Sequence, residues 1–233
     1  MIDRAFLRRL RAPFRRARGR LSMSLGRVGS SKPLSRDFGY SRGTPIDRYY
    51  IERFLADHAS DIKGRVLEVG DDSYSRRFGG KRVEKQDILH ITPDHPGASI
   101  TGDLADPSVL PSAAFDCIIL KQTLHLIFDL QAAAQQIHRA LAPGGVALIT
   151  VPGISPIDRG EWGDSWCWSL TSGALSRVLI DPFDPEKVAI STYGNLRAAT
   201  AFLHGASVEE VGRSRLDPFD PAYPVTVAAR AQV

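Results

Sequence analysis

The stretch Arg65-Val66-Leu67-Glu68-Val69-Gly70 decides the fold of this 233-residue chain. Its apolar residues predict a buried strand, and the glycine after them predicts a turn where the strand ends. Acids or glycines recur where further strands are expected to end, at Asp87 and at Gly102-Asp103-Leu104, and the apolar run Phe115–Leu120 leads on to Leu141-Ala142-Pro143-Gly144-Gly145. Because the carboxyl ends of parallel strands share one edge of a sheet, where open α/β sheets bind ligands, we expect the functional site there.

Strands and helices are expected to alternate from residue 64 onward, which predicts an α/β fold with a parallel sheet. The expected strands are Arg65–Val69, Lys81–Gln86, Ala98–Thr101, Phe115–Leu120, Val146–Val151, Val188–Thr192 and Val225–Ala229. Asp129 is a candidate N-cap for the helix between the fourth and fifth strands. Only eleven residues, Gly70 to Gly80, form the first crossover, so we expect a stunted helix there.

An additional helix is expected before the first strand, ending near His58. Thr44 can cap it, Pro45 suits its first turn, and Asp47 can complete a capping box.

The charge of the chain divides at about residue 32. Residues 1–32 hold ten Lys and Arg and one acid, whereas residues 33–233 carry a net charge of −5. We therefore expect a basic N-terminal arm (1–32) attached to one folded domain (33–233). The arm's apolar residues recur at near-helical spacing among arginines, which indicates contact with an anionic membrane surface; a solvated tail and an organellar transit peptide are the alternatives. A basic arm on an acidic body argues against nucleic acid as the partner.

The composition indicates a globular protein of the cytoplasm, either free or peripheral at the inner membrane surface. It is 43% hydrophobic and 24% charged, and no apolar run approaches the roughly 20 residues that span a bilayer. The two cysteines form no disulfide framework, and the six histidines are scattered, so we expect no metal site.

The order and spacing of the strand-end signals resemble class I S-adenosylmethionine-dependent methyltransferases over roughly residues 64–152. The most family-specific string is Leu141-Ala142-Pro143-Gly144-Gly145, which resembles the family's turn into the fifth strand. The resemblance implies a Rossmann-like three-layer sandwich, with a mostly parallel seven-stranded sheet and an antiparallel last strand. It also implies S-adenosylmethionine as the cofactor.

The glycine motif after the first strand departs from the family's pattern. Glu68 and Gly70 are kept, but Asp72 and Tyr74 stand where later glycines belong. The change removes the fingerprint that lets a backbone approach a pyrophosphate, and the acids at 71 and 72 repel a phosphate. S-adenosylmethionine has a cationic sulfonium and no phosphate, so the departure argues against NAD more than against the methyl donor.

The resemblance implies a set of cofactor-binding residues at the ends of four strands. They are Glu68, Val69, Gly70, Asp71, Asp87, Asp103, Leu104, Lys121 and Gln122. A carboxylate at Asp87 can accept both ribose hydroxyls; in the alternative, Asp87 is a turn residue or Glu84 takes this position. Asp103 is implied to accept a hydrogen bond from the adenine amino group, or it caps a helix. Lys121 and Gln122 are implied to border the sulfonium.

The candidate substrate residues are aromatic. Trp162 and Trp166 follow the fifth strand and can stack on an acceptor, or form a lid that packs on the body. Tyr50 on the first helix can lie over the ligand, as can Arg48, unless Tyr50 packs in the core.

His125, beyond the fourth strand, is the candidate general base, with helix packing as its alternative role. We interpret the chain as a methyltransferase that methylates an oxygen atom of a small molecule or glycan. The alternatives are an N-methyltransferase and a catalytically inactive methyltransferase-like module that binds a partner.

Overall fold

The computed structural model describes residues 30–160 and 162–233. The basic arm expected at residues 1–32 lies almost entirely outside the described residues and stays a prediction. Within the described residues, no helix is both long enough and apolar enough to cross a membrane.

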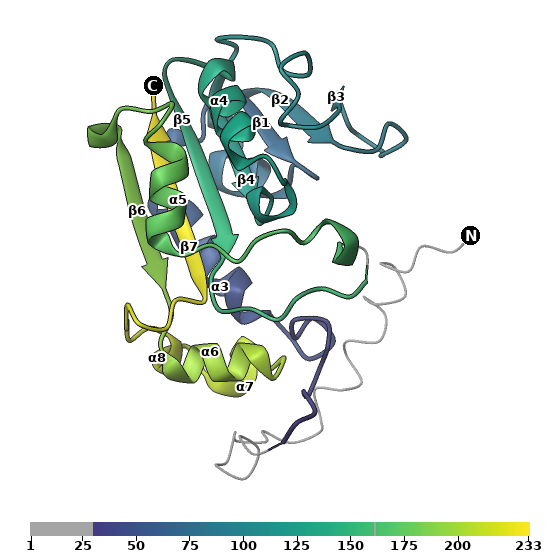
Figure 1. Cartoon of the computed structure of the whole chain (residues 1–233), viewed down its shortest axis with the longest axis vertical. Coiled ribbons are helices and arrows are strands. Elements are labelled where there is room, and N and C mark those ends of the chain that lie inside the picture. The colour runs from purple at the N-terminus through teal and green to yellow at the C-terminus, as the bar shows by residue number, and fades with distance from the viewer. Residues whose placement is uncertain (1–29, 161) are drawn as a thin grey trace.

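The described residues form a seven-stranded sheet with the order β3-β2-β1-β4-β5-β7-β6 (Figure 1). The strands are β1 (Gly64–Val69), β2 (Val83–His90), β3 (Ile100–Thr101), β4 (Phe115–Lys121), β5 (Leu141–Pro152), β6 (Val188–Tyr193) and β7 (Thr226–Gln232). β7 pairs antiparallel with both β5 and β6, and the other neighbours are parallel. This arrangement confirms the predicted fold class.

Helices cover both faces of the sheet. α4 (Leu130–Ala140) and α5 (Ser172–Leu179) pack on one face, and α3 (Ile46–Asp57) packs on the other (Figure 1). Successive residues of a strand point to opposite faces, so Ile118 joins the core under α4 and α5 while Ile119 joins the core under α3.

The predicted cap of α4 is confirmed, and the predicted cap of α3 is wrong. The Asp129 carboxylate accepts a hydrogen bond from the Ala132 N–H at 2.9 Å. The Thr44 hydroxyl instead donates a hydrogen bond to the Glu209 carboxylate, with Oγ1 and Oε1 2.8 Å apart. Pro45 occupies the N-cap of α3 and has no side-chain group to cap it. A partner 165 residues away thus competes with the local cap.

The first crossover is stunted, as predicted. A π-helical turn (Ser75–Gly79) and a 3-10 turn (Gly80–Arg82) replace a full helix. Short crossovers leave this part of the sheet with little cover, so the residues after β1 must be held by other contacts.

The predicted end of the second strand is wrong. β2 continues past Asp87 to His90, because Leu89 pairs with Ile100 and His90 pairs with Thr101 of β3. An acid is tolerated inside this strand because its carboxylate is fully bonded, as described below.

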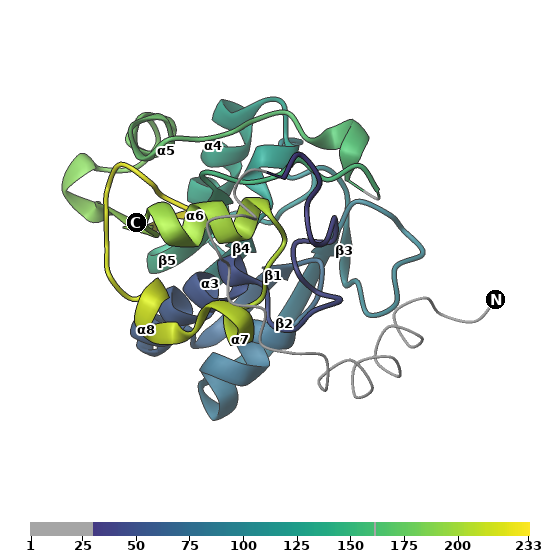
Figure 2. The ribbon, with the colours of Figure 1, turned by 90° about the horizontal axis from the view of Figure 1, so that it is seen from below.

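Three short helices close the end of the sheet toward which β5 points: α6 (Leu196–Leu203), α7 (Val208–Val211) and α8 (Arg213–Leu216) (Figure 2). α6 and α8 pack against the first turns of α3, and Tyr50 lies in that cluster with 1% of its surface exposed. Its hydroxyl donates a hydrogen bond to the Leu216 carbonyl at 2.9 Å. The expectation that Tyr50 contacts the substrate is therefore wrong, because the side chain belongs to the core.

Replacing Tyr50 with Phe should lower the free energy of unfolding by about 0.5–1.5 kcal/mol, because the Leu216 carbonyl loses the shorter of its two hydrogen bonds and keeps the one from the Asn195 amide at 3.3 Å. Urea denaturation measures this change. The matched control is Tyr49→Phe, which removes a hydroxyl bonded to Asp217 near the surface and should cost less than about 0.5 kcal/mol. Cofactor affinity should stay the same in both variants. A loss of cofactor affinity in Tyr50→Phe but not in Tyr49→Phe would show that Tyr50 belongs to the binding site.

Candidate functional site

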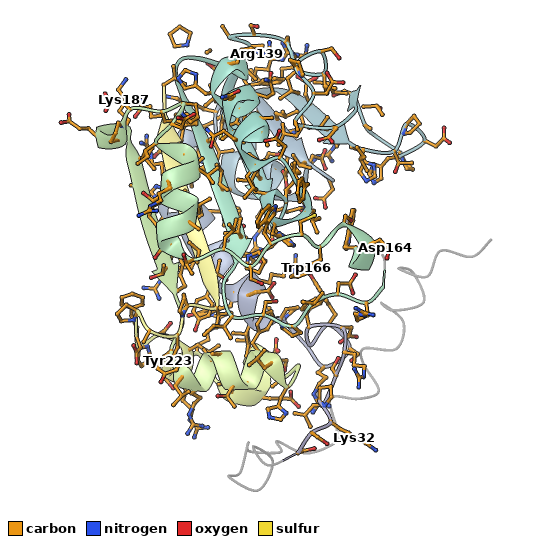
Figure 3. All side chains as sticks on the ribbon, in the orientation of Figure 1. Lys32, Arg139, Asp164, Trp166, Lys187 and Tyr223 are labelled. Atoms are coloured by element: carbon orange, nitrogen blue, oxygen red, sulfur yellow. The ribbon has the colours of Figure 1, made fainter. Side chains whose placement is uncertain are left out.

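A cavity of about 840 Å³ opens at the carboxyl ends of β1, β2, β4 and β5. The β5–α5 loop borders it, and Figure 3 shows Trp166 of that loop near the ends of the central strands. Of the residues predicted for the site, Val69, Gly70, Asp71, Asp103, Leu104, Lys121, Gln122, His125, Trp162 and Trp166 line this cavity. Glu68, Asp87 and Tyr50 are not among its lining residues.

The turn after β1 forms one wall of the cavity. Gly70 has φ +91°, which favours glycine, and its N–H donates to the Leu89 carbonyl at 3.0 Å. This bond ties the turn to β2. Asp71 follows, and its carboxylate accepts a hydrogen bond from the Lys121 Nζ at 2.6 Å.

Glu68 lies directly beneath this turn and is fully buried. Its carboxylate accepts hydrogen bonds from the Tyr74 N–H at 3.3 Å and the Ser75 N–H at 2.8 Å, and Lys121 Nζ lies 3.4 Å away. Burial raises the pKa of the Glu68 carboxyl above its ordinary value despite the nearby ammonium of Lys121. The expected contact of Glu68 with the cofactor is thus replaced by a role in holding the turn.

The end of β4 supplies Lys121 and Gln122. Gln122 adopts φ +48°, an uncommon conformation for a non-glycine residue, and the buried Nε2 of its side chain has no hydrogen-bond partner. Strain together with an unpaired donor is typical of a functional position.

The ends of β2 and β3 form the opposite wall. Asp103 lines the cavity, and its carboxylate accepts a hydrogen bond from the Ala105 N–H at 2.9 Å, which leaves further acceptor capacity. His90 and His95 also line this wall, and their rings stack at 3.9 Å.

Asp87 lies three residues before the end of β2 and is 6% exposed. Its carboxylate accepts hydrogen bonds from Arg65 Nε at 2.7 Å and from the Ser99 hydroxyl at 3.0 Å. Burial alone would raise the pKa of Asp87, but these two partners hold it below its ordinary value. The expectation that Asp87 binds ribose is therefore corrected: its oxygens are occupied inside the sheet.

The β5–α5 loop covers the cavity through aromatic contacts. Trp166 packs edge-on against His125 with ring centres 4.4 Å apart, and Phe38 stacks on Trp166 at 6.2 Å. Two backbone N–H groups of the loop, at Cys167 and Trp168, donate to the His125 carbonyl at 3.0 and 3.1 Å. Burial lowers the pKa of His125 to about 4.

Asp47 and Arg48 at the start of α3 line the cavity, one helical turn before Tyr50. Asp47 accepts a hydrogen bond from the Arg48 N–H at 2.8 Å, and in the described part of the chain it forms no ion pair, since Arg48 pairs with Glu52 at 3.0 Å. Burial raises the pKa of Asp47 to about 6.

Several residues that line this cavity carry a buried polar atom without a partner. Among the described residues, six buried side-chain nitrogen or oxygen atoms have no hydrogen-bond partner. Four of them belong to residues that line the cavity: His95 Nδ1, Gln122 Nε2, His125 Nδ1 and Trp166 Nε1. Buried polar groups are normally paired, so the cavity fits a ligand rich in hydrogen-bonding atoms. The carboxylate, sugar oxygens and ring nitrogens of S-adenosylmethionine meet this requirement.

Sequence reasoning missed Asp47, His90, His95 and Phe38 as lining residues. A signal for His90 is present in the sequence, since it follows the apolar pair Ile88-Leu89, but Asp87 offers a competing end for the strand. The sequence around Asp47 indicates a helix cap and hides its place in the cavity. Nothing in the local sequence marks Phe38, which lies far from the sheet in sequence.

A family model described as a methyltransferase domain matches residues 32–180 of this chain. No curated protein matches the chain in sequence.

Solved structures share its fold at low identity. An S-adenosylmethionine-dependent methyltransferase from Archaeoglobus fulgidus is 11% identical, with a TM-score of 0.53 over 80% of this chain and 94% of that one. One from Mesorhizobium loti is 18% identical, with a TM-score of 0.52 over 81% and 98%. The [4+2]-cyclase SpnF is 16% identical, with a TM-score of 0.52 over 82% and 83%. These likenesses show the fold alone, which does not specify the reaction.

Replacing Asp87 with Asn should lower the free energy of unfolding by about 1–3 kcal/mol at neutral pH, because Arg65 loses its charged partner. The folded pKa of Asp87 is depressed, so its contribution is full above the unfolded pKa of about 3.9. The deficit should shrink as the pH falls below about 4.

Glu84→Gln is the control, since Glu84 lies exposed on the same strand, and it should change stability little. Affinity for S-adenosylhomocysteine should stay within about threefold in both variants. A larger loss of affinity that occurs only in Asp87→Asn would show that Asp87 binds the ribose.

Proposed function

We propose that this chain, which belongs to the methyltransferase-domain family, methylates an oxygen atom of a small molecule or glycan. It is an S-adenosylmethionine-dependent methyltransferase by family, with that donor as its cofactor. When bound, the donor supplies an electrophilic methyl group on a cationic sulfur. The observation that carries the proposal is one cavity at the carboxyl ends of the strands, four of whose lining residues carry an unpaired polar atom.

The chain's own residues would hold the cofactor at three strand ends. Asp103 and Leu104 are suited to the adenine, because one offers carboxylate oxygens and the other a backbone N–H. Gly70 and Asp71 border the place where β1 meets β4, with Lys121 and Gln122 opposite. The order of the strands reverses between β1 and β4, which is where open α/β sheets place their ligands.

The size and lining of the cavity support a small or sugar-like acceptor. A volume of about 840 Å³ has room for the cofactor and for part of a second small molecule. Trp162, Trp166 and Phe38 offer aromatic faces on which a sugar or an aromatic ring can stack. The same aromatic cover excludes water from the reacting groups.

A hydroxyl acceptor must lose a proton, and His125 and Asp47 are the two cavity residues that we compare as the group that accepts it. His125 was expected to do so, but a pKa of about 4 makes it a weak base. Asp47 has a pKa of about 6, which is closer to the pH of the cytoplasm. Asp47 is therefore the preferred general base, and His125 acts mainly through its packing against Trp166.

The alternative, an inactive module that only binds a partner, keeps one observation in its favour. Asp72 and Tyr74 still replace two glycines of the family's motif. Cofactor binding separates this alternative from the enzyme.

Titration calorimetry should detect binding of S-adenosylhomocysteine and no binding of NAD, because the turn after β1 lacks the glycines that admit a pyrophosphate. A protein that binds NAD and not S-adenosylhomocysteine would refute the proposed enzyme, and one that binds neither would favour the inactive module. Release of S-adenosylhomocysteine from S-adenosylmethionine, across a panel of hydroxylated and amine compounds, then identifies the acceptor and the methylated atom.

With the acceptor so identified, kcat/KM should fall as the pH drops below about 6, because Asp47 accepts a proton only when ionised. Asp47→Asn should lower kcat by about a hundredfold or more and abolish this acidic limb. His125→Ala should lower thermal stability while changing kcat little. An acidic limb near pH 4, with normal turnover in Asp47→Asn, would assign the base to His125 instead.

A further inference from the structure

The end of β2 carries a histidine where a carboxylate was expected. His90 is the last residue of the strand, pairs with Thr101, and lines the cavity, whereas Asp87 is bonded within the sheet. The Gly102 N–H donates to the His90 carbonyl at 3.1 Å, so His90 lies beside the turn that carries Asp103.

The order of the strands tells which part of the ligand passes His90. β2 lies between β3, followed by Asp103, and β1, followed by Gly70. If the adenine lies at Asp103 and the sulfur lies between Gly70 and Lys121, the sugar that joins them must cross the end of β2. His90 is the described cavity residue that ends that strand.

The hydrogen bonds of His90 fix which ring nitrogen carries its proton. The Thr92 N–H donates to His90 Nδ1 at 3.0 Å, so Nδ1 is an acceptor and the proton of the neutral ring is on Nε2. His90, which lines the cavity, therefore carries its donor on Nε2. The neighbouring His95, stacked at 3.9 Å, has a buried Nδ1 without a partner.

We propose that His90 and His95 together bind the ribose hydroxyls of the cofactor, in place of the carboxylate that usually ends this strand. His90 Nε2–H donates a hydrogen bond to one sugar oxygen, and His95 Nδ1 accepts a hydrogen bond from a sugar hydroxyl. The two neutral histidines, one a donor and one an acceptor, thus replace the two acceptor oxygens of a carboxylate. This proposal rests on the proposed use of S-adenosylmethionine and not on the identity of the acceptor.

Two variants of His90 separate binding of the ligand from support of the loop. His90→Asn keeps an acceptor near the Nδ1 position for Thr92 and loses the donor at the Nε2 position. His90→Gln places an amide donor near the Nε2 position and loses the contact with Thr92. Calorimetry with S-adenosylhomocysteine should show about a five- to tenfold loss of affinity in His90→Asn and a smaller loss in His90→Gln. A structural role predicts the opposite order, and that order would overturn the proposal.

A second ligand tests the target of the two histidines. The analogue of S-adenosylhomocysteine that lacks both the 2′ and 3′ hydroxyls should bind the wild-type protein at least tenfold more weakly, and His90→Asn and His95→Ala should not weaken it further. Equal losses for both ligands would overturn the assignment to the ribose.

His138→Ala is the matched control: His138 lies on α4, its ring packs edge-on against Phe183, and it is not among the residues that line the cavity, so the variant should leave both affinities unchanged. Thermal melts confirm that each variant is folded. If the wild-type protein binds no S-adenosylhomocysteine, the proposed function fails; if it binds and the His90 variants bind equally well, only this inference fails.

Discussion

The buried carboxylate of Glu68 is the constraint on which the site depends. It is fully enclosed, and such a group is costly unless it is bonded. Its partners are the backbone of Tyr74 and Ser75, in the turn that stands in for the first crossover helix, and Lys121 at the end of β4. One side chain therefore connects the two strand ends between which the sheet order reverses, and the turn keeps its place without a helix to support it.

The same network changes the meaning of the acids that replace the family's glycines. Asp71 is bonded to Lys121 at 2.6 Å, and Asp72 pairs with Arg76 at 2.5 Å. Both acids have cationic partners within the chain, so simple repulsion of a phosphate is a weaker argument against NAD than the sequence indicated. The stronger argument is steric: the turn bears side chains where a pyrophosphate needs bare backbone.

The fold could be predicted from the sequence because apolar strands and helical stripes repeat in a regular order, and their periods depend only on local residues. The strand-end positions of Gly70, Asp103 and Lys121 followed from that order. The errors have a common cause, which is a distant partner. Asp87 remains within β2 because Arg65 and Ser99 satisfy it, Thr44 is diverted by Glu209, and Tyr50 is buried by α8. A single sequence does not reveal which distant residues become partners in the folded chain.

The polarity of the cavity is uneven, and this unevenness favours one orientation of the proposed cofactor. Near the ends of β2 and β3, the lining combines stacked histidines with Leu104 and one partly bonded acid, Asp103. Near β1, β4 and α3, it gathers Asp47, Asp71, Arg48 and Lys121. Charges are costly to remove from water unless opposite charges face them, so we propose that the zwitterionic and sulfonium end of the cofactor would lie at the second wall and the adenosine at the first. In that orientation the methyl group would lie on the side of Asp47, the residue that we propose as the general base.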